Sequence, residues 1–394
     1  MRTRPLKALF TKNNAFNRMV ESGHEFRAIE LEATAKMLAC GTTMLGGMHY
    51  HCENSHCQHS IVIKASCKSK LCQTCGQKAT ERWIAIQMEV LPDCAWRHIT
   101  FTMPDTFWEV FKLNRALLGK LFSIASEGLL SFARLKKLTI GIFSALHTYG
   151  RQLNFNCHIH LSVSAIGLTT DGELIPFHYP FKALKSLWRY GVTSLLRNHF
   201  NELTLPEKLS TRVSNEKEWN RALDKEYLKT WQVNIAKTTT HKAHTANYLG
   251  RYLKKPPIAG SRLRHYAGES VTMGYHDHRS NRAKELELSQ MELIARILSH
   301  VPEKYFKMVR NYGFLSNRLR GLLLPILYEK LKQTVKEVVT PSYAAMLKSY
   351  VKVDPYECIL CGGRMMFSRF ESGVSLYTLV LGLRRLAKLK RVEA

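Results

Sequence analysis

Acidic residues are scarce in this chain of 394 residues, which contains 31 Asp and Glu against 58 Lys and Arg. No arrangement of these few acids indicates a nuclease site built on three carboxylates. The formal net charge of +27 costs self-repulsion unless a polyanion neutralises it. Nucleic acid is the usual polyanion, because each neutralised phosphate releases counterions and adds affinity. An inert basic surface, or one that faces a membrane, explains so large a charge less well.

Long hydrophobic runs are also missing. No stretch of eighteen apolar residues occurs, and the first ten residues, MRTRPLKALF, lack the apolar core of a signal peptide. We therefore expect an intracellular protein. Hydrophobic residues make up 45% and charged residues 23%, as in folded chains, and the length suits two or three domains. In a reducing compartment, the ten cysteines are better explained as metal ligands than as disulfides.

The pattern of apolar residues predicts an α+β fold. Strand-like patterns predict strands at 97–103, 139–147, 158–166 and 271–276, with alternating faces in the first and strict alternation in the third. Helical spacing predicts helices in most other segments. We expect a central antiparallel sheet with helices, preceded by a small zinc-binding module and followed by a helical C-terminal region. The expected domains are 1–92 (N-terminal helices and zinc module), 93–283 (sheet domain with a helical insertion near 176–236) and 284–394 (basic helical region).

Two histidines, His158 and His160, lie on the strand predicted at 158–166 (HIHLSVSAI). Side chains two residues apart on a strand point to the same face, so both imidazoles lie side by side while Ile159 points into the core. Two imidazoles on one rigid strand form a partial metal site that lacks a third ligand. A His-x-His on an exposed strand is more often a solvated pair, so this triplet alone does not establish a metal site.

A helix predicted at 246–255 carries a second motif, Tyr-Leu-Gly-Arg-Tyr-Leu-Lys-Lys, in which Tyr248 and Tyr252 lie on one face at i and i+4. A tyrosine hydroxyl has a pKa of about 10, so it is a poor nucleophile unless a metal or base lowers its pKa. A divalent ion bound by the two histidines would do so and would polarise a phosphate under attack. Two helical tyrosines alone are more simply packing residues; both motifs in a basic chain favour catalysis. The residues predicted to grip flanking phosphates are Arg251, Lys254 and Lys255.

The stretch 156–160 (NCHIH), followed by 248–257 (YLGRYLKKPP), resembles the HUH-endonuclease transposases of the insertion-sequence-91 family, including its common-region elements. The resemblance extends over most of the chain. It also covers the cysteine block 67–75, the strand from His98 to Pro104, and the run from His300 to Arg318. Several motifs in the same order make the resemblance specific.

The resemblance implies rolling-circle transposition in bacteria, by a cytoplasmic protein that is associated with the nucleoid when bound to DNA. In that family, His158 and His160 would hold Mg²⁺ or Mn²⁺. Tyr248 or Tyr252 would attack a DNA phosphodiester and stay joined to the 5′ end. The substrate would be single-stranded DNA, beside a hairpin at the end of the mobile element. Because the phosphotyrosine bond keeps the energy of the broken bond, strand transfer and resealing would need no ATP.

Two parts of this site remain open at the level of sequence. Related enzymes use one or two tyrosines, and this chain offers both. HUH enzymes also draw the third metal ligand from different places, and the spacing here favours none of the chemically possible residues. These residues are His98, His147, Gln152, Asn154 and His244.

Two close cysteine pairs, Cys52-x4-Cys57 and Cys72-x2-Cys75, lie about one loop apart near the N-terminus. We predict that these four residues bind one tetrahedral structural zinc, because four buried free thiols would otherwise be liable to oxidation. The resemblance also places a zinc-binding domain here. The spare candidate ligands are Cys40, His51, His59 and Cys67. Two lysines of this block are predicted to contact DNA, Lys68 and Lys70.

A further Cys-x-x-Cys occurs near the C-terminus, at Cys358 and Cys361, followed by two glycines. It is similar to half of a zinc knuckle, but two cysteines alone rarely hold zinc. We therefore interpret this motif as an incomplete site. We interpret Cys94 and Cys157 as ordinary buried thiols.

Two other functions remain as alternatives. A plasmid replication initiator or relaxase shares the histidine pair and the tyrosine, but its family does not generally carry the N-terminal cysteine block. A zinc-dependent DNA-binding regulator without catalysis explains the charge and the cysteines, yet it makes the histidine and tyrosine motifs incidental. The transposase hypothesis accounts for all of these features.

Overall fold

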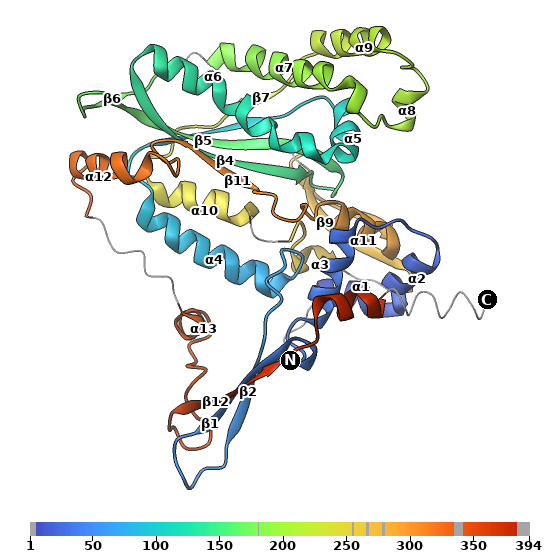
Figure 1. Ribbon diagram of the computed structural model, residues 1–394, viewed down its shortest axis with the longest axis vertical. Coiled ribbons are helices and arrows are strands. Elements are labelled where there is room, and N and C mark those ends of the chain that lie inside the picture. The colour runs from blue at the N-terminus through green and yellow to red at the C-terminus, as the bar shows by residue number, and fades with distance from the viewer. Residues whose placement is uncertain are drawn as a thin grey trace.

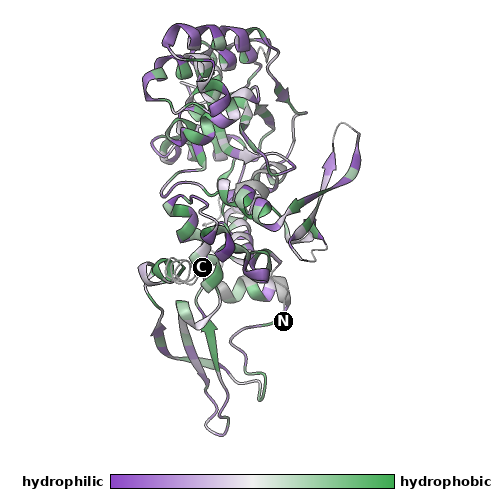
Figure 2. Cartoon of the chain, turned by 90° about the vertical axis from the view of Figure 1, so that its right-hand side faces the viewer, coloured by the Kyte–Doolittle hydropathy of each residue, from purple (hydrophilic) through white to green (hydrophobic). Residues whose placement is uncertain are grey.

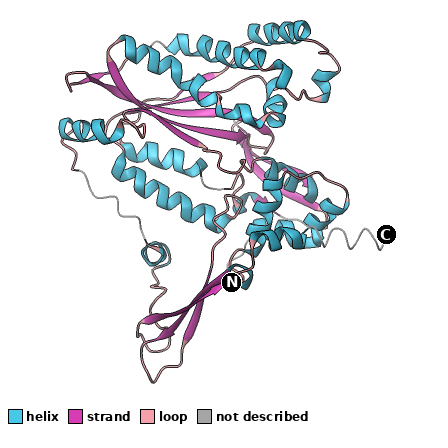
Figure 3. Cartoon of the chain, in the orientation of Figure 1, coloured by secondary structure: helices cyan, strands magenta, loops and turns pink. Residues whose placement is uncertain are grey.

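The computed structural model describes residues 5–179, 181–253, 256–264, 268–277, 280–334 and 342–383. These residues form three antiparallel sheets with helices around them (Figures 1 and 3). The largest sheet belongs to a sheet domain, the second packs with the N-terminal helices, and the third projects from the body as a small lobe. The expected α+β class with a central antiparallel sheet is confirmed.

The strand order in the sheet domain is β11-β4-β5-β3-β7, and the short strand β6 pairs with β5. Every pair in this sheet is antiparallel. The strands predicted at 97–103, 139–147 and 158–166 correspond to β3, β4 and β5. The bounds are β3 (Trp96–Phe101), β4 (Leu138–Tyr149), β5 (Phe155–Thr169), β6 (Leu174–Pro176), β7 (Val233–Ile235) and β11 (Val309–Gly313).

One face of this sheet is covered by helices from two parts of the chain (Figure 1). Ile99, Ile142 and Ile159 project from this face into a core with helical residues such as Trp188 and Trp219, each at most 1% exposed. Both tryptophans belong to the segment 176–236, so this segment completes the main core. The helices are α5 (Thr106–Leu113), η3 (Arg115–Gly119), α6 (Leu121–Leu135), α7 (Phe181–Asn198), η4 (Phe200–Glu202), α8 (Glu207–Ser210) and α9 (Glu216–Leu228).

The opposite face of the sheet packs against a second set of helices (Figure 1). Its core joins Trp96 and Phe143 of the sheet with Ala246 of α10 and Leu327 of α12, all of them buried. Alternation along β5 places His158 and His160 on this second face, because Ile159 between them belongs to the first. The helices are α4 (Gln73–Val90), α10 (Lys242–Leu253) and α12 (Arg320–Lys330).

The second sheet lies in what we call the N-terminal unit. Its strand order is β10-β9-β8, and it shares a hydrophobic core with the first three helices and α11. Leu9 and Phe16 from the N-terminus pack there with Met273 and Leu293. The elements are α1 (Pro5–Thr11), η1 (Lys12–Asn14), α2 (Ala15–Glu21), α3 (Ala28–Ala39), η2 (Thr43–Leu45), η5 (Gly260–Arg262), β8 (Leu263–Arg264), β9 (Ser270–Asp277), β10 (Arg282–Ser289) and α11 (Gln290–Ser299).

The third sheet forms the projecting lobe, which we call the hairpin lobe. The hairpin β1–β2 pairs with β12 from the other end of the chain, in the order β12-β1-β2. Figure 2 shows hydrophobic residues along the strands of this lobe, at the bottom of the view. The strands are β1 (Gly46–Cys52), β2 (Ser60–Lys64) and β12 (Met365–Ser372), and α13 (Tyr343–Val351) precedes β12 in the chain.

The packing cuts across the division by residue number that the sequence suggests. The expected C-terminal region 284–394 contributes β10 and α11 to the N-terminal unit, β11 and α12 to the sheet domain, and β12 to the hairpin lobe. The strand predicted at 271–276 is present as β9, but it lies in the N-terminal unit. Residues 384–394, which include most of the basic tail, lie outside the described residues.

One helical segment among the described residues, Arg115–Leu135, is long and apolar enough to cross a membrane by length and composition alone. It spans η3 and α6. Leu121, Phe122 and Leu129 of this segment are fully buried against the central sheet. Its apolar composition is therefore accounted for by core packing.

Candidate metal and DNA-binding site

Three histidines meet where β4 and β5 run side by side. His158 and His160 lie on β5, and His147 of β4 pairs directly with His158. The candidate ligand nitrogens of the three rings all lie within 4.8 Å of one another. The ring centroid of His147 is 5.3 Å from that of His158 and 4.3 Å from that of His160. One rigid hairpin therefore brings three imidazoles to a single point.

Hydrogen bonds orient two of these rings. Nδ1 of His158 donates to the backbone carbonyl of Asn156 at 2.8 Å. Because a carbonyl oxygen only accepts, this bond places the proton on Nδ1 and leaves the Nε2 lone pair for a metal. Nδ1 of His160 lies 3.2 Å from the hydroxyl oxygen of Thr100 on β3. Hydrogen bonds of this kind hold metal-binding imidazoles in position.

Burial keeps the three imidazoles neutral. It lowers the pKa of His158 to about 4, although the hydrogen bond to Asn156 acts in the opposite direction. Burial, together with the charges of His158 and His98, lowers the pKa of His160 to about 3. The pKa of His147 is held well below its ordinary value by burial and by the two other rings. Because only neutral imidazole binds a metal, protons do not compete for this site near pH 7.

The residues present fit a divalent metal with open coordination positions. Three protein ligands leave room for water or a substrate oxygen, as in catalytic metal sites. Within the part of the chain that the structure describes, no carboxylate belongs to this group. Imidazole donors suit Mn²⁺ better than Mg²⁺, which prefers oxygen ligands.

Among the five possible third ligands, His147 is the residue that the structure brings to the pair. Nδ1 of His98 instead lies 2.6 Å from the hydroxyl of Ser162, and Gln152 donates to the hydroxyl of Tyr275 at 3.0 Å. The side chain of His244 lies outside the described residues. Which of these residues lies beside His158 and His160 depends on the register of β4 against β5, and local spacing does not reveal that register.

The helix with the tyrosine motif, α10, lies on the same face of the sheet as the histidines. Ala246 of α10 is buried against Phe143 and Ala145 of β4. By alternation, these two residues share a face of β4 with His147. Ala145 also pairs with His160 across the sheet. The fold therefore brings the two sequence motifs to one side of one sheet.

Within α10, Gly250 allows close packing against α4. A Cβ added at this glycine would lie 2.4 Å from Cγ1 of Ile84. Tyr248 and Tyr252 lie two residues before and after Gly250 in the helix, but their side chains lie outside the described residues, as does that of Arg251. The predicted phosphate contacts Lys254 and Lys255 lie outside them entirely.

A basic cleft of about 440 Å³ opens between the cysteine block and the strand beside β4. Lys68 and Lys70 line one side, and Lys307 lines the other. No acidic residue is among the lining residues. The backbone amide of Leu146 donates to the carbonyl of Met308 at 3.0 Å, so the lining segment 306–309 runs next to the strand that carries His147. The charge of Lys70 also lowers the pKa of His147, after burial and the two other rings.

Lys307 was not among the predicted contacts. It lies in the run from His300 to Arg318, which carries part of the family resemblance but no motif for binding DNA. Its place in the cleft depends on the chain returning from α11 to the edge of the sheet, where β11 pairs with β4. Within the sequence, only the excess of basic residues indicated a contact with DNA here.

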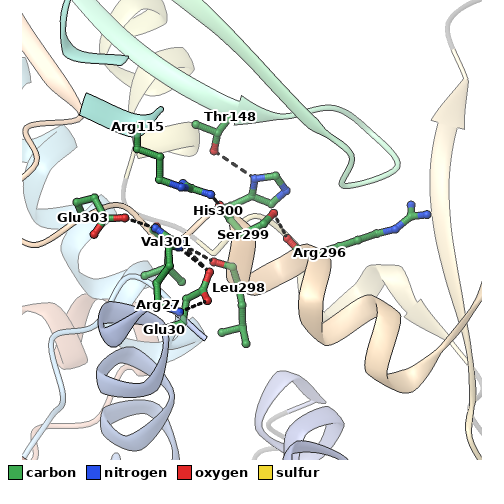
Figure 4. A network of polar contacts seen from close by, with 10 residues as sticks. All are labelled: Arg27, Glu30, Arg115, Thr148, Arg296, Leu298, Ser299, His300, Val301 and Glu303. Atoms are coloured by element: carbon green, nitrogen blue, oxygen red, sulfur yellow. Dashed lines mark hydrogen bonds and ion pairs between the residues drawn. The ribbon is translucent and has the colours of Figure 1, made fainter. Parts of the chain in front are cut away.

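A polar network holds this end of β4 against the N-terminal unit (Figure 4). The hydroxyl of Thr148, next to His147, lies 3.2 Å from Nδ1 of His300. Arg115 and Arg27 donate to backbone carbonyls at or just beyond the C-terminal end of α11, at 2.8 and 2.9 Å. Cations at this end of a helix also offset its dipole. The network therefore fixes the strand end that carries the third histidine.

Four cysteines form a buried cluster in the N-terminal unit, which we call the inner cluster. Their sulfur atoms all lie within 4.8 Å of one another. Sγ of Cys75 is 3.6 Å from that of Cys40 and 3.5 Å from that of Cys67. Cys72 and Cys75 lie at the start of α4, where the helix dipole favours thiolates. The members are Cys40, Cys67, Cys72 and Cys75.

The structure corrects the predicted grouping of the cysteines. Cys52 and Cys57 do not join Cys72 and Cys75, because β1 carries them away from α4 into the hairpin lobe. The spare candidates Cys40 and Cys67 complete the inner cluster instead. The predicted pairs are therefore halves of two different four-cysteine groups.

The interpretation of the C-terminal Cys-x-x-Cys as an incomplete site is also wrong. Cys358 and Cys361 meet Cys52 and Cys57 in a second cluster, which we call the outer cluster. Strand β12 makes this possible, because it pairs with β1 and aligns Met365 with Cys52. A ligand set split over the two ends of a chain leaves no local spacing signal.

Comparison with known proteins adds to this geometry. Residues 141–321 match the family described as "Putative transposase", and residues 11–103 match the "Transposase zinc-binding domain" family. The first match contains the three histidines and α10, and the second contains the inner cluster. No solved structure shows significant similarity to the chain.

Two relatives are similar over much of their length. The transposase for insertion sequence element IS801 from Pseudomonas savastanoi pv. phaseolicola is 42% identical over 393 residues, which cover 99% of this chain and 95% of the relative. The "Putative transposase y4qJ" of Sinorhizobium fredii is 30% identical over 292 residues, which cover 71% of this chain and 73% of the relative. The similarity to the first relative includes all three sheets.

Proposed function

This chain belongs to the insertion-sequence-91 family of transposases, and we propose that it nicks and joins single-stranded DNA at the ends of its mobile element. DNA is therefore its partner, and the N-terminal region contains the zinc-binding domain of these transposases. We propose further that the reaction follows the rolling-circle route with a 5′-phosphotyrosine intermediate, in the bacterial cytoplasm.

The observation that carries this proposal is the cluster of His147, His158 and His160 on the sheet face that packs against α10. Neutral, oriented imidazoles fit a divalent metal, and the helix beside them carries Tyr248 and Tyr252. A tyrosine nucleophile next to a metal site is suited to attack on a phosphodiester. Neither motif would support this chemistry without the other.

The proposed cleavage is a balanced exchange of two phosphate esters. The hydroxyl oxygen of Tyr248 or Tyr252 attacks a DNA phosphorus, and a tyrosine–phosphorus bond forms. The bond from phosphorus to the 3′ oxygen breaks, and the tyrosine proton is transferred to solvent as that oxygen leaves and takes up a proton. In the joining step, a 3′ hydroxyl attacks the phosphotyrosine and regenerates the tyrosine. Because one ester replaces another, neither step needs ATP.

The histidines would hold Mn²⁺, or less suitably Mg²⁺, with Nε2 of His158 as one ligand. When bound, such an ion supplies positive charge that stabilises the developing negative charge on the phosphate. His147 and His160 complete the ligand set that the chain itself provides. Thr100 and the carbonyl of Asn156 keep the rings oriented.

The basic cleft supports a path for the DNA strand. Lys68, Lys70 and Lys307 offer three positive charges beside the strand that carries His147. Partly buried Phe306 lines the same cleft and offers a ring on which a base can stack. We propose that this cleft binds the single-stranded DNA next to the cleavage site, together with the DNA hairpin at the end of the mobile element. Arg251, Lys254 and Lys255 would hold phosphates nearer the tyrosines.

The decisive test is formation of a covalent protein–DNA adduct. Labelled single-stranded oligonucleotides from the element's ends are incubated with the protein and Mn²⁺, and adducts are resolved on a denaturing gel. We expect an adduct with wild type and none with the double variant Tyr248→Phe, Tyr252→Phe. The single variants identify the primary tyrosine.

A matched control is Tyr190→Phe, which changes an exposed tyrosine of α7 on the other side of the sheet. This variant should form the adduct at the wild-type rate. Absence of an adduct with wild type, or its persistence in the double tyrosine variant, would contradict the proposed mechanism.

A further inference from the structure

The outer cluster joins two segments that are three hundred residues apart in sequence. Sγ of Cys52 lies 3.3 Å from that of Cys361, and Sγ of Cys57 lies 3.7 Å from that of Cys358. A disulfide requires sulfurs about 2.05 Å apart, so neither contact is a disulfide. A zinc ion with sulfur ligands at about 2.3 Å separates those sulfurs by roughly 3.8 Å in a tetrahedron. The measured separations therefore fit a shared metal ion.

We propose that Cys52, Cys57, Cys358 and Cys361 bind a second structural zinc ion that clamps β12 onto the β1–β2 hairpin. The matched zinc-binding domain ends at residue 103, so it includes only half of this site. Four thiolate ligands close the coordination sphere, which suits a structural rather than a catalytic ion. Soft thiolate donors in a tetrahedral group favour zinc over Mg²⁺ or Mn²⁺.

Backbone amides face three of the four sulfurs of the outer cluster. Amide groups of Asn54 and His59 face the sulfurs of Cys52 and Cys57. On the other side of the site, amides of Leu360 and Cys361 face the sulfur of Cys358. Hydrogen bonds from backbone N–H groups stabilise the charged sulfur. Such amides on both halves are expected of a site built to hold a metal.

Cys358 also has a side-chain partner. Nδ1 of His59 lies 3.1 Å from the sulfur. His59 therefore serves as a hydrogen-bond partner of a ligand.

The two glycines after Cys361 are required by the turn. Gly362 has a φ of +73°, a conformation that other residues rarely adopt. A Cβ added at Gly363 would lie 3.3 Å from Sγ of Cys52 and 3.4 Å from that of Cys361. A side chain there would crowd two ligands. The sequence Cys-x-x-Cys-Gly-Gly is thus fitted to a metal-binding turn.

The hairpin lobe has too little hydrophobic core to hold itself together. Its buried core consists of Tyr50, Cys52, Cys358 and Met365, so two of the four residues are proposed ligands. Phe367 and Phe370 on β12 remain 55% and 63% exposed. Units of this size need a disulfide, a metal or a partner in addition to their core. The proposed zinc supplies this connection between β12 and the hairpin.

The test compares metal content and local protection in the full-length protein. Zinc is measured in wild type, in Cys358→Ser/Cys361→Ser and in Cys40→Ser/Cys75→Ser. We expect each double variant to lose one zinc per chain relative to wild type. Replacement of zinc by Co²⁺ reports on thiolate ligands directly, and the sulfur–cobalt absorption should fall by about half in the outer-cluster variant.

Hydrogen exchange locates the structural effect. In Cys358→Ser/Cys361→Ser, amides of β1, β2 and β12 should exchange faster, while those of β4 and β5 should keep their protection. The single change Cys361→Ser should act in the same direction, whereas Cys361→His should retain zinc, because a site with three cysteines and one histidine still binds it. Cys361 is exposed, so neither change disturbs the core.

Cys94→Ala is the matched control, since Cys94 is buried outside both clusters and should leave the zinc content unchanged. An outer-cluster variant with wild-type zinc content would overturn the proposal, as would a wild-type site occupied by iron. None of these measurements depends on DNA cleavage. The second zinc site would therefore stand if the tyrosine mechanism were wrong, and the tyrosine mechanism would stand if the second zinc site were wrong.

Discussion

The three-histidine site and the two four-cysteine clusters differ in the number of donors and in their surroundings. The histidines lie on paired strands of the central sheet, which is held by a large core on both faces. The cysteines lie on loops and at the ends of helices and strands. The sheet thus supplies the geometry of the histidine site, whereas in each cluster an ion would join separate segments of the chain. Three ligands leave an open position that suits catalysis, and four ligands close a site that suits structure.

The two cysteine clusters differ from each other in the size of the hydrophobic core that surrounds them. The inner cluster is part of a core with residues such as Phe10, Phe16 and Leu293. Two cysteines of the outer cluster make up half of the small buried core of the hairpin lobe. Loss of the inner ion should therefore disturb a large cooperative unit, and loss of the outer ion only a small one.

The largest effect on DNA cleavage is expected from the double variant His158→Ala, His160→Ala. Adduct formation should fall by about a thousand-fold or more, because a metal supplies several kcal/mol of charge stabilisation. The melting temperature should change by only a few degrees, since the sheet does not depend on this metal. Single-turnover assays and calorimetry measure both quantities. His178→Ala, at an exposed histidine, is the control; a folded variant with near-normal activity would contradict the assignment.

The next effect separates the two cysteine clusters. Cys40→Ser/Cys75→Ser should unfold the N-terminal unit at 25 °C, because structural zinc contributes on the order of 10 kcal/mol to the folding of the segments that bind it. Cys358→Ser/Cys361→Ser should leave the main unfolding transition nearly unchanged. Calorimetry with hydrogen exchange distinguishes these outcomes. An equal loss of global stability in both variants would contradict this expectation, because the hairpin lobe would then fold cooperatively with the N-terminal unit and the sheet domain.

A smaller effect concerns the pH dependence of stability that is due to His300, which contacts the end of β4 near the histidine site. It is measured without any metal. Burial lowers the pKa of His300 to about 3, from an ordinary value of 6.5. As the pH falls below 6.5, the unfolded chain protonates this group and the folded chain does not, so stability falls by up to about 1.4 kcal/mol per pH unit until the folded pKa is reached. His300→Gln should remove this contribution, because an amide does not titrate.

The glutamine amide introduced in His300→Gln would retain a donor for the carbonyl of Leu153 and an acceptor for Thr148, as the imidazole does. Urea unfolding of the metal-free protein at pH 7, 6 and 5 measures the slope. The control His178→Ala should keep the wild-type slope. A slope that is the same in His300→Gln and wild type would mean that His300 titrates normally.

The smallest effect concerns the basic cleft. Lys307→Gln should weaken binding of single-stranded DNA a few-fold and reduce the salt dependence of log K by about 0.7, the share of one phosphate contact. Lys208→Gln, on α8 beyond the other face of the sheet, should change neither quantity. Binding titrations between low and moderate salt measure both. An unchanged salt dependence in Lys307→Gln would place the DNA elsewhere.

Local patterns were sufficient for much of the fold. Strand-like patterns, strictly alternating only in 158–166, predicted β3, β4 and β5 within a few residues, because successive side chains on a strand point to opposite faces. The His158–His160 pair followed from the same rule. Segment 284–336 was predicted to be mainly helical, but it contains most of β10 and all of β11, and these two strands belong to different sheets.

The candidate site also contains residues that local patterns predicted and residues that they did not predict. The residues within each motif could be predicted, since two histidines on one strand and two tyrosines on one helix are neighbours by local geometry. The residues that complete each group could not. His147 depends on strand register, Lys307 on the return of the chain to the sheet edge, and Cys358 on a pairing between the two ends of the chain.

By itself, the sequence determined which reactive groups this protein offers: an excess of positive charge, a pair of imidazoles on one strand, a pair of tyrosines on one helix, and ten thiols. These properties belong to residue types and to spacings of a few residues. Only the tertiary structure decided which donors lie close enough to share an ion, because cysteines far apart in sequence meet through β1 and β12 and not through any local spacing. The physical reason is that a ligand set is defined by distance in space, which strand register and long-range pairing determine.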